Sequence, residues 1–395
     1  MQIQRIKYRD LEQFPQIKIQ QKFKQDFFGS VPAPFIGRFG YPNINVGILS
    51  PQFIGETANY DSPKLWSQNN YQIPNIANLR YGLVNSHHKG NVKQLSSRFI
   101  ELVQEVGMAT KAAEVEINLK KAPQLQFKPE KEIIPFGPQS EIRKARITSN
   151  TKIDSKVEKI VTDTDLKSSL GLIELYKKGF EESFLNKILS VGNLGLKKNR
   201  KLVPTRWSIT AVDDTIGKNL IEEIKQFPVG EHQLYFGGEW GNYYLILFFP
   251  EVWSYELFEM YLEVKANPWS KKGFFYSTDY ENYSGRKNYA EECAGGYYAA
   301  RMPVLERMQN NRRQNSALVL RFITPEYNVP LGVWVCREAS RKSLTEKAIN
   351  FSSQELMFKY AEELIKKKFS FDINVLLKES KLLKEKKLQK RLVDY

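Results

Sequence analysis

Apolar residues recur at helical spacing along several stretches of the chain. In residues 94–113, Phe99, Leu102, Val103 and Val106 fall on one face, which predicts a helix with its apolar face in a core. The same periodicity predicts further helices after Asp165, from about Glu182, after Pro250 around Leu257 and Phe258, over residues 296–308, and from about residue 353, where Ser352 and Glu355 have the spacing of a capping box.

Continuous apolar runs predict strands. Residues 243–249 form such a run and stop at Pro250, and residues 318–323 and 331–335 follow the same pattern. Glycines and prolines punctuate residues 31–63, which indicates turns and short strands. Residues from about 120 to 161 are rich in Lys, Pro and Ser, which is typical of an extended excursion or a linker.

Together these patterns predict an α+β fold, a two-domain mixed α/β protein with a basic C-terminal tail that is helical and then flexible. In residues 366–395, ten Lys and Arg stand against four Asp and Glu. We expect an N-terminal extension at 1–30, an N-terminal domain at 31–268 that includes the polar excursion at about 120–161, a C-terminal α+β domain at 269–370, and the basic tail at 371–395.

The charge balance favours a polyanionic partner. The chain has 395 residues and a formal net charge of +15, with 59 Lys and Arg against 44 Asp and Glu. DNA or RNA fits this balance, although an anionic membrane surface would attract the same charge. No run of about 18 apolar residues and no secretory leader is present, so we expect a cytoplasmic, nucleoid-associated protein without a membrane partner.

Cysteine and histidine usage argues against a metal centre. The chain has two cysteines and three histidines, and no HxxxH, HExxH or CxxC spacing. Cys336 lies in an apolar run, which indicates a buried thiol. We therefore expect no metal site, and the sequence identifies no cofactor.

A first polar cluster spans residues 201–215. Lys201 and Arg206 could grip phosphate, while Asp213 and Asp214 could hold a divalent ion or act as acid and base. Alternatively, Asp214 begins a helix as its N-cap with Thr215, and Asp213 pairs with Arg206.

A second cluster spans residues 35–47, where glycines surround Arg38. Glycine permits tight turns and close backbone approach, so Arg38 beside exposed amides could bind a phosphate. A purely structural turn explains the same glycines. Neither a Walker loop nor a dinucleotide-binding fingerprint occurs in the chain.

A third cluster, over residues 276–301, interleaves tyrosines with basic groups. Tyr297 could stack on a base and Arg301 could grip phosphate, as single-stranded or flipped-base binding requires. In the alternative interpretation, Tyr297, Tyr298 and Leu305 form the core face of a helix, and Arg301 pairs with Glu306 or Glu338.

The last seven residues fit the motif Gln-x-x-aliphatic-x-x-aromatic by which other proteins dock on a DNA sliding clamp. Gln389 would bond the rim of a pocket, and a single 3₁₀ turn would place Leu392 and Tyr395 on one side, inside that pocket. The alternative is a solvated, lysine-rich end.

In this order, the motifs resemble the archaeal Nre family of DNA repair proteins. The resemblance implies two domains, a role in repair of DNA damage, and, for many members, docking on the PCNA sliding clamp, for which Gln389, Leu392 and Tyr395 are the matching residues here. Many members begin with a Cys-rich segment that this sequence does not match, and no catalytic residue set carries over. The matching blocks are Phe35–Gly47, Val157–Lys167, Gly195–Thr215, Glu291–Glu306 and Arg313–Glu338.

The leading hypothesis is therefore a DNA repair factor recruited by the PCNA clamp, whose basic body binds DNA or a nucleotide-like ligand through Arg38, Arg206 and Arg301. The first alternative is an enzyme acting on a nucleotide or on modified DNA through a cluster of Arg206, Asp213, Asp214 and Glu291, with Asp213, Asp214 or Glu291 as catalytic groups. The second alternative is a non-catalytic repair adaptor.

Overall fold

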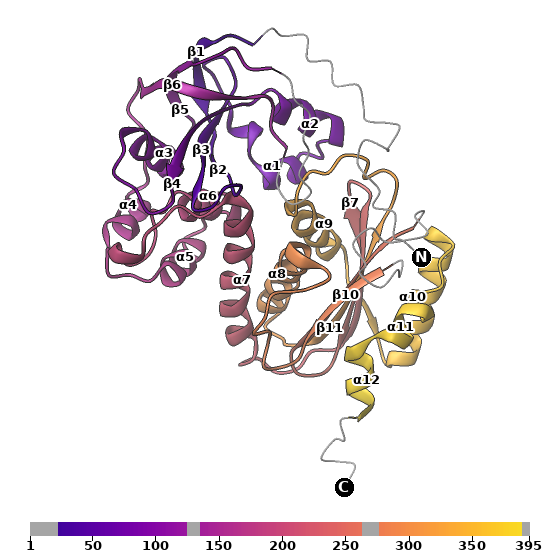
Figure 1. Ribbon diagram of the computed structural model, residues 1–395. Helices are drawn as coiled ribbons and strands as arrows, with labels where there is room; N and C mark the ends of the chain where they lie inside the picture. The colour runs from indigo at the N-terminus through magenta and orange to yellow at the C-terminus, as the bar shows by residue number, and fades with distance from the viewer. Residues whose placement is uncertain (1–22, 125–134, 263–275, 389–395) are drawn as a thin grey trace. The chain divides into compact units, whose positions relative to one another are not determined.

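The computed structural model describes residues 23–124, 135–262 and 276–388 (Figure 1). It confirms an α+β fold with two mixed sheets. The chain forms two compact units: a first unit of the described residues up to Ile216 with Val329–Val333, and a second unit of the described residues of Gly217–Asn328 and Trp334–Tyr395. The expected boundary near residue 268 lies outside the described residues, and the expected division into domains stays a prediction.

The described residues of the first unit form a six-stranded sheet in the order β1-β5-β6-β4-β3-β2. Neighbouring strands are antiparallel except β4 and β6, which are parallel. The strands are β1 (Asp26–Val31), β2 (Ala33–Ile36), β3 (Asn43–Ser50), β4 (Val84–Asn91), β5 (Ala113–Leu119) and β6 (Gln139–Ile147).

Helices surround this sheet and connect its strands. They are the 3₁₀ turns η2 (Ala58–Tyr60) and η3 (Lys197–Asn199), the helices α1 (Pro63–Gln68), α2 (Ile73–Tyr81), α3 (Arg98–Met108), α4 (Ser155–Thr162), α5 (Ser168–Lys177) and α6 (Glu182–Ser190), and the beginning of α7 (Thr205–Ile224).

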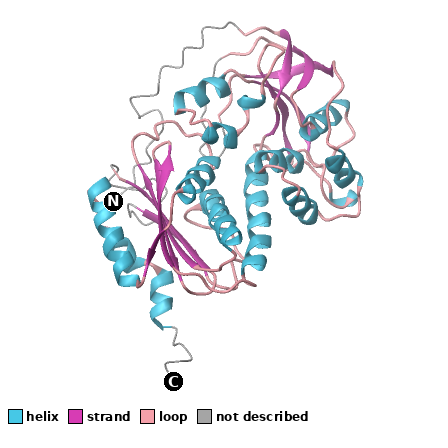
Figure 2. Ribbon diagram, turned by 180° about the vertical axis from the view of Figure 1, so that it is seen from behind, coloured by secondary structure: helices cyan, strands magenta, loops and turns pink. Residues whose placement is uncertain are grey.

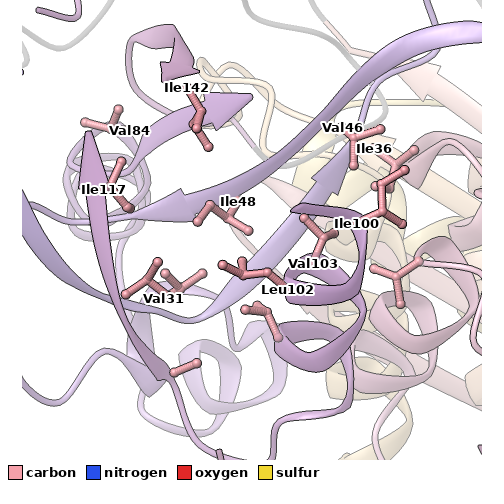
Figure 3. Close-up of a cluster of buried hydrophobic side chains, with 14 of the residues drawn as sticks. Val31, Ile36, Val46, Ile48, Val84, Ile100, Leu102, Val103, Ile117 and Ile142 are labelled. Carbon is pink, nitrogen blue, oxygen red and sulfur yellow. The ribbon is translucent and has the colours of Figure 1, made fainter. Parts of the chain in front are cut away.

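Helix α3 confirms the helix predicted within residues 94–113. The Ser97 side chain caps it by accepting a hydrogen bond from the Ile100 amide at 3.3 Å. Leu102, Val103 and Val106 are buried, as their spacing predicts. Figure 3 shows that α3 side chains pack with strand residues in one core, among them the labelled Ile36, Val46 and Ile48.

The expected polar excursion at about 120–161 is wrong in part, because it contains strand β6 and most of helix α4. Only one side chain of strand β6, that of Ile142, is buried, so the strand has the polar sequence of a segment in contact with solvent. Its backbone, however, pairs with β5 on one side and β4 on the other. Backbone pairing of this kind leaves little trace in the hydrophobic pattern.

The described residues of the second unit form a six-stranded sheet in the order β10-β9-β11-β8-β7-β12, in which only β9 and β11 are parallel. Helices lie on both faces: α8 and α9 on one side, and α10, α11 and α12 on the other (Figures 1 and 2). The strands are β7 (His232–Glu239), β8 (Asn242–Phe249), β9 (Ser254–Tyr261), β10 (Tyr276–Glu281), β11 (Ser316–Ile323) and β12 (Ile349–Phe351), and the helices are α8 (Ala294–Asn311), α9 (Trp334–Thr345), α10 (Gln354–Phe369), α11 (Asn374–Glu379) and α12 (Lys381–Leu388).

Several predictions for this unit are confirmed, and three are wrong. Strands β8 and β11 and helices α8 and α10 lie where the sequence predicts them. The helix predicted around Leu257 and Phe258 is strand β9, and the strand predicted at 331–335 gives way to helix α9 from Trp334. The cap of α10 is Ser353, which accepts a hydrogen bond from the Leu356 amide at 3.3 Å, so the capping residue lies one position after the predicted Ser352.

The start of the basic tail belongs to the core of the second unit. Ile373, Leu376, Leu382 and Leu383 are buried in the cluster that α10, α11 and α12 form with the sheet. Residues 371–388 thus contain the packed helices α11 and α12, which confirms the helical part of the predicted tail. Residues 389–395 lie outside the described residues.

Helix α12 is fixed to the sheet by a buried carboxylate. Glu256 of β9 accepts hydrogen bonds from the Ser380 hydroxyl at 2.5 Å, the Lys381 amide at 2.9 Å and the Leu382 amide at 3.0 Å. An anion at this position satisfies donors that a helix N-terminus leaves open. Burial raises the pKa of Glu256 in spite of these bonds.

We predict that Glu256→Ala lowers the free energy of unfolding by about 2 kcal/mol or more, because it leaves buried donors without an acceptor. Urea unfolding followed by circular dichroism measures this. The control Glu379→Ala removes an exposed carboxylate of α11 and is expected to change the free energy of unfolding by less than about 0.5 kcal/mol. Equal stability of the two variants would show that the cap is not needed.

Candidate nucleic-acid interface

The first unit carries a group of exposed aromatic and half-buried basic side chains, which we call the aromatic–basic patch. It consists of Arg38, Phe39 and Tyr41 in the turn between β2 and β3, and of Arg206 and Trp207 in the first turn of α7. The exposed fraction is 69% for Phe39, 44% for Tyr41 and 46% for Trp207. Large aromatic side chains at such exposure mark a binding surface when basic groups accompany them.

Backbone and ring contacts hold the two halves of the patch together. The Ile36 amide donates to the Thr205 hydroxyl at 2.9 Å, which ties the end of β2 to the start of α7. The rings of Tyr41 and Trp207 lie 5.3 Å apart at 50°. Two segments more than 160 residues apart in sequence therefore form one surface.

The turn itself is fixed at both ends. The Gly37 amide donates to the Asn45 carbonyl at 2.8 Å, and the Val92 amide donates to the Pro42 carbonyl at 3.0 Å. The Arg38 guanidinium carbon lies 4.5 Å from the centre of the Phe39 ring, a cation–π distance. The patch thus presents preformed rings and a guanidinium on a rigid turn.

The structure brings together Arg38 and Arg206, which sequence reasoning proposed from two separate clusters. Sequence reasoning missed Phe39, Tyr41 and Trp207 as functional candidates. Their signal was present, since Phe39 follows Arg38 directly, Trp207 follows Arg206 directly, and Tyr41 lies three positions after Arg38.

Asp213 and Asp214 lie in the middle of α7. The alternative in which Asp214 is a helix N-cap is wrong, because α7 begins at Thr205. The Asp213 side chain is buried and Asp214 is half-buried. Consecutive residues of a helix point about 100° apart, so the helix does not direct both carboxylates to one ion.

Tyr297 and Arg301 lie in the interior of the second unit. Tyr297 is fully buried, and Arg301 is 1% exposed, with its Nη1 atom donating to the Glu281 carboxylate at 2.8 Å. Tyr297, Tyr298 and Leu305 form a core face of α8, as the alternative interpretation predicted. Direct nucleic-acid contact by Tyr297 or Arg301 stays a prediction, and their burial disfavours it.

Glu306 and Glu338, which sequence analysis gave as alternative partners of Arg301, both bind another arginine. Arg341 of α9 donates to both Glu306 and Glu338, at 2.7–3.0 Å. Glu281 of β10 is the carboxylate to which Arg301 donates, and pairing of Arg301 with Glu306 or Glu338 stays a prediction.

The N-terminus of α8 is occupied by a carboxylate of the chain itself. Asp279 of β10 accepts hydrogen bonds from the amides of Glu291, Glu292 and Cys293 at 3.1, 2.9 and 2.7 Å. A helix N-terminus attracts anions, and Asp279 fills the position that a phosphate would take. Glu291 is exposed, and its proposed catalytic role stays a prediction.

Two glycines permit the close approach of charged groups to α8 and α7. A Cβ atom at Gly296 would lie 2.9 Å from Glu259 Oε1, and one at Gly217 would lie 2.9 Å from Arg301 Nη2. Gly296 of the third cluster thus permits close packing inside the second unit, and Gly217 does the same on α7.

The catalytic candidates fall in different units. Asp213 and Asp214, with Arg206 of the same proposed cluster, belong to the first unit, while Glu291 belongs to the second. A site that uses all of them stays a prediction. Gln389, Leu392 and Tyr395 lie outside the described residues.

The cysteines are buried and unreactive in character. Burial raises the pKa of Cys336 to about 11 and that of Cys293 well above its usual range, so both thiols stay protonated at neutral pH. Within the described ranges, no group of three His, Cys, Asp or Glu side chains could hold a metal ion. Over the same ranges, no helix has the length and apolar character that a membrane crossing requires.

Comparison with known proteins identifies the family. The family model "Archaeal Nre, N-terminal" matches residues 7–270, and "Archaeal Nre, C-terminal" matches residues 281–395. The chain belongs to the archaeal Nre family. No solved structure matches this Nre protein significantly.

Curated relatives agree with this assignment. The Nre protein is 34% identical over 373 residues to "DNA repair protein NreB" of Archaeoglobus fulgidus, which covers 94% of the chain and 92% of the relative. It is 36% identical over 352 residues to "DNA repair protein NreA" of the same organism (88% and 85%) and 35% identical over 321 residues to "DNA repair protein NreA" of Haloferax volcanii (79% and 76%).

We predict that Glu281→Ala lowers the free energy of unfolding by about 3–5 kcal/mol, because it leaves the Arg301 guanidinium buried without its carboxylate. Replacing both residues, as in Arg301→Met with Glu281→Leu, is expected to lower the free energy of unfolding by less than Glu281→Ala does, because no buried charge is left unpaired. Urea unfolding of the three proteins measures this. A double variant less stable than Glu281→Ala would contradict a structural role for the pair.

Proposed function

We propose that this Nre protein is a DNA repair factor that contacts DNA through the aromatic–basic patch and is recruited by docking of its tail on the PCNA sliding clamp. The repair role rests on the family and on the names of three relatives that align over most of their length. The patch supplies the observation that supports DNA contact: three exposed rings and two arginines in one place.

The chemistry of the patch suits DNA with unpaired bases. Every base has a π face, so exposed Phe39, Tyr41 and Trp207 can stack on bases of any sequence, at about 1–3 kcal/mol per base. Arg38 and Arg206 can neutralise neighbouring phosphates. The net charge of +15 attracts the polyanion over a longer range.

The tail supports recruitment. Gln389, Leu392 and Tyr395 follow directly after α12, which Glu256 and a buried leucine pair hold on the second unit. Seven residues reach at most about 25 Å. A clamp bound to this tail would therefore stay beside the folded second unit, and the body would act at a high effective concentration on DNA that passes through the clamp.

We predict that Trp207→Ala weakens binding of a single-stranded oligonucleotide by about 1–3 kcal/mol, because one stacking platform is lost. Arg38→Ala is expected to lower the slope of log affinity against log salt by about 0.7, the contribution of one phosphate contact on a single strand. Fluorescence anisotropy with a labelled oligonucleotide at several salt concentrations measures both.

Matched controls are available in the chain. Tyr360→Ala removes a ring of similar exposure in the second unit, and Arg143→Ala removes an exposed arginine of β6. Both are expected to bind the oligonucleotide as the unaltered protein does. The patch assignment fails if Trp207→Ala and Arg38→Ala bind no more weakly than these controls.

For the clamp, we predict that a form ending at Leu388 loses binding to the cognate PCNA ring in isothermal titration calorimetry, because the pocket-filling residues are absent. In the full-length protein, Leu392→Ala is expected to weaken binding strongly, while Lys390→Ala, between the motif positions, is expected to change it little. Equal binding of the truncated and full-length forms would refute clamp docking by the tail.

A further inference from the structure

The first unit contains an uncharged pocket that shares no residue with the aromatic–basic patch. Its volume is about 680 Å³, and the rings of Phe53, Tyr60 and Tyr71 line it together with several asparagines. Among the described residues that line it, none is Asp, Glu, Lys, Arg or His. In a chain with a net charge of +15, such a surface is distinctive.

The walls of the pocket are fixed by buried interactions. The Arg80 guanidinium donates to the Asp61 carboxylate at 2.7 Å, the Tyr60 carbonyl at 2.9 Å and the Pro135 carbonyl at 2.8 Å. The Trp66 indole donates to the Asn59 carbonyl at 2.6 Å. These contacts hold η2 and α2 in place, so the pocket exists before any ligand binds, as a preformed site requires.

The pocket offers aromatic rings together with neutral hydrogen-bonding groups. Phe53 is 46% exposed, and its ring lies 6.1 Å from that of Tyr60 at 67°. The side-chain amides of Asn59, Asn69 and Asn78 make no hydrogen bond to any described residue. Each amide supplies both donors and an acceptor, which is the pattern that the edge of a heteroaromatic ring requires.

We propose that this pocket binds a single nucleobase. The absence of cationic side chains from its described lining disfavours a phosphate or carboxylate ligand, and the rings favour a planar one. Asparagine amides match the donors and acceptors on the edges of bases. The base can belong to a free nucleoside or to an extrahelical nucleotide of DNA, because both present the same chemistry.

The first experiment titrates the full-length protein with adenosine, guanosine, cytidine and thymidine, up to about 10 mM, and follows binding by saturation-transfer NMR. Saturable binding of at least one nucleoside is expected, with equal affinity at about 50 and 500 mM salt, because the ligand carries no charge. Absence of binding overturns the proposal. Strong weakening by salt also overturns it, because that would place the ligand on the basic surface.

Variants locate the binding. Asn78→Ala, on the exposed face of α2, is expected to weaken nucleoside binding at least fivefold while the helix persists, because alanine is a good helix former. Asn310→Ala is the matched control, an exposed asparagine of α8 outside the pocket, and is expected to have no effect. The pocket assignment is contradicted if both changes weaken nucleoside binding equally, or if neither change weakens it.

Two further arms identify the ligand and its source. Ribose alone should not compete with the nucleoside; competition at equal concentration would show a sugar site and overturn the proposal. A duplex with one bulged base that binds more tightly than its paired counterpart, and loses this advantage in Asn78→Ala, identifies an extrahelical nucleotide. Nucleoside binding without such an advantage identifies a free nucleoside. Both results support a base pocket. If Trp207→Ala and Arg38→Ala do not weaken binding of the oligonucleotide, the aromatic–basic patch is refuted but the base pocket is not.

Discussion

Buried carboxylates of the neighbouring strands β9 and β10 fix the helices on both faces of the second unit's sheet. On one face, Glu256 caps α12. On the other, Asp279 caps α8 and Glu281 pairs with Arg301 of the same helix. Charges inside a protein persist only where bonds compensate their loss of hydration. Each carboxylate therefore specifies which helix end packs against which strand.

The same carboxylates explain where sequence reasoning about the fold failed. In residues 254–261, Glu256 and Glu259 interrupt an apolar pattern as the polar face of a helix would, but both are buried in strand β9. The groups that donate hydrogen bonds to them lie far away in sequence, so no local pattern reveals them. Helix α9 was misread for a related reason, since a helix buried on nearly all sides starts with an apolar run that a strand shares. Elements with one buried face, such as α3, were predictable.

For the candidate site, the sequence pointed to two segments that the structure brings together, but not to the aromatic residues between them. Arg38 emerged because glycines surround it and Arg206 because it lies in a polar cluster, yet the two segments meet through the hydrogen bond from Ile36 to Thr205. Tyr297 and Arg301 gave an equally strong signal and proved to be core residues. Burial separates the two cases, and it depends on tertiary packing that a single sequence does not encode locally.

The proposed contacts make different physical demands, and the chain distributes them accordingly. Electrostatic contact with phosphates requires cations that the phosphates can reach. Such contact, which we propose for the aromatic–basic patch, weakens as the salt concentration rises. Recognition of a single base requires an uncharged and preformed surface, as the pocket between Phe53 and the asparagines provides. Both lie in the first unit, while the clamp motif follows α12 of the second unit. Because α12 is held by Glu256 and its own buried leucines, clamp docking would act on the second unit without altering the chemistry of either surface on the first. Recruitment and recognition would then contribute to function as separable terms, the first through effective concentration and the second through direct contact.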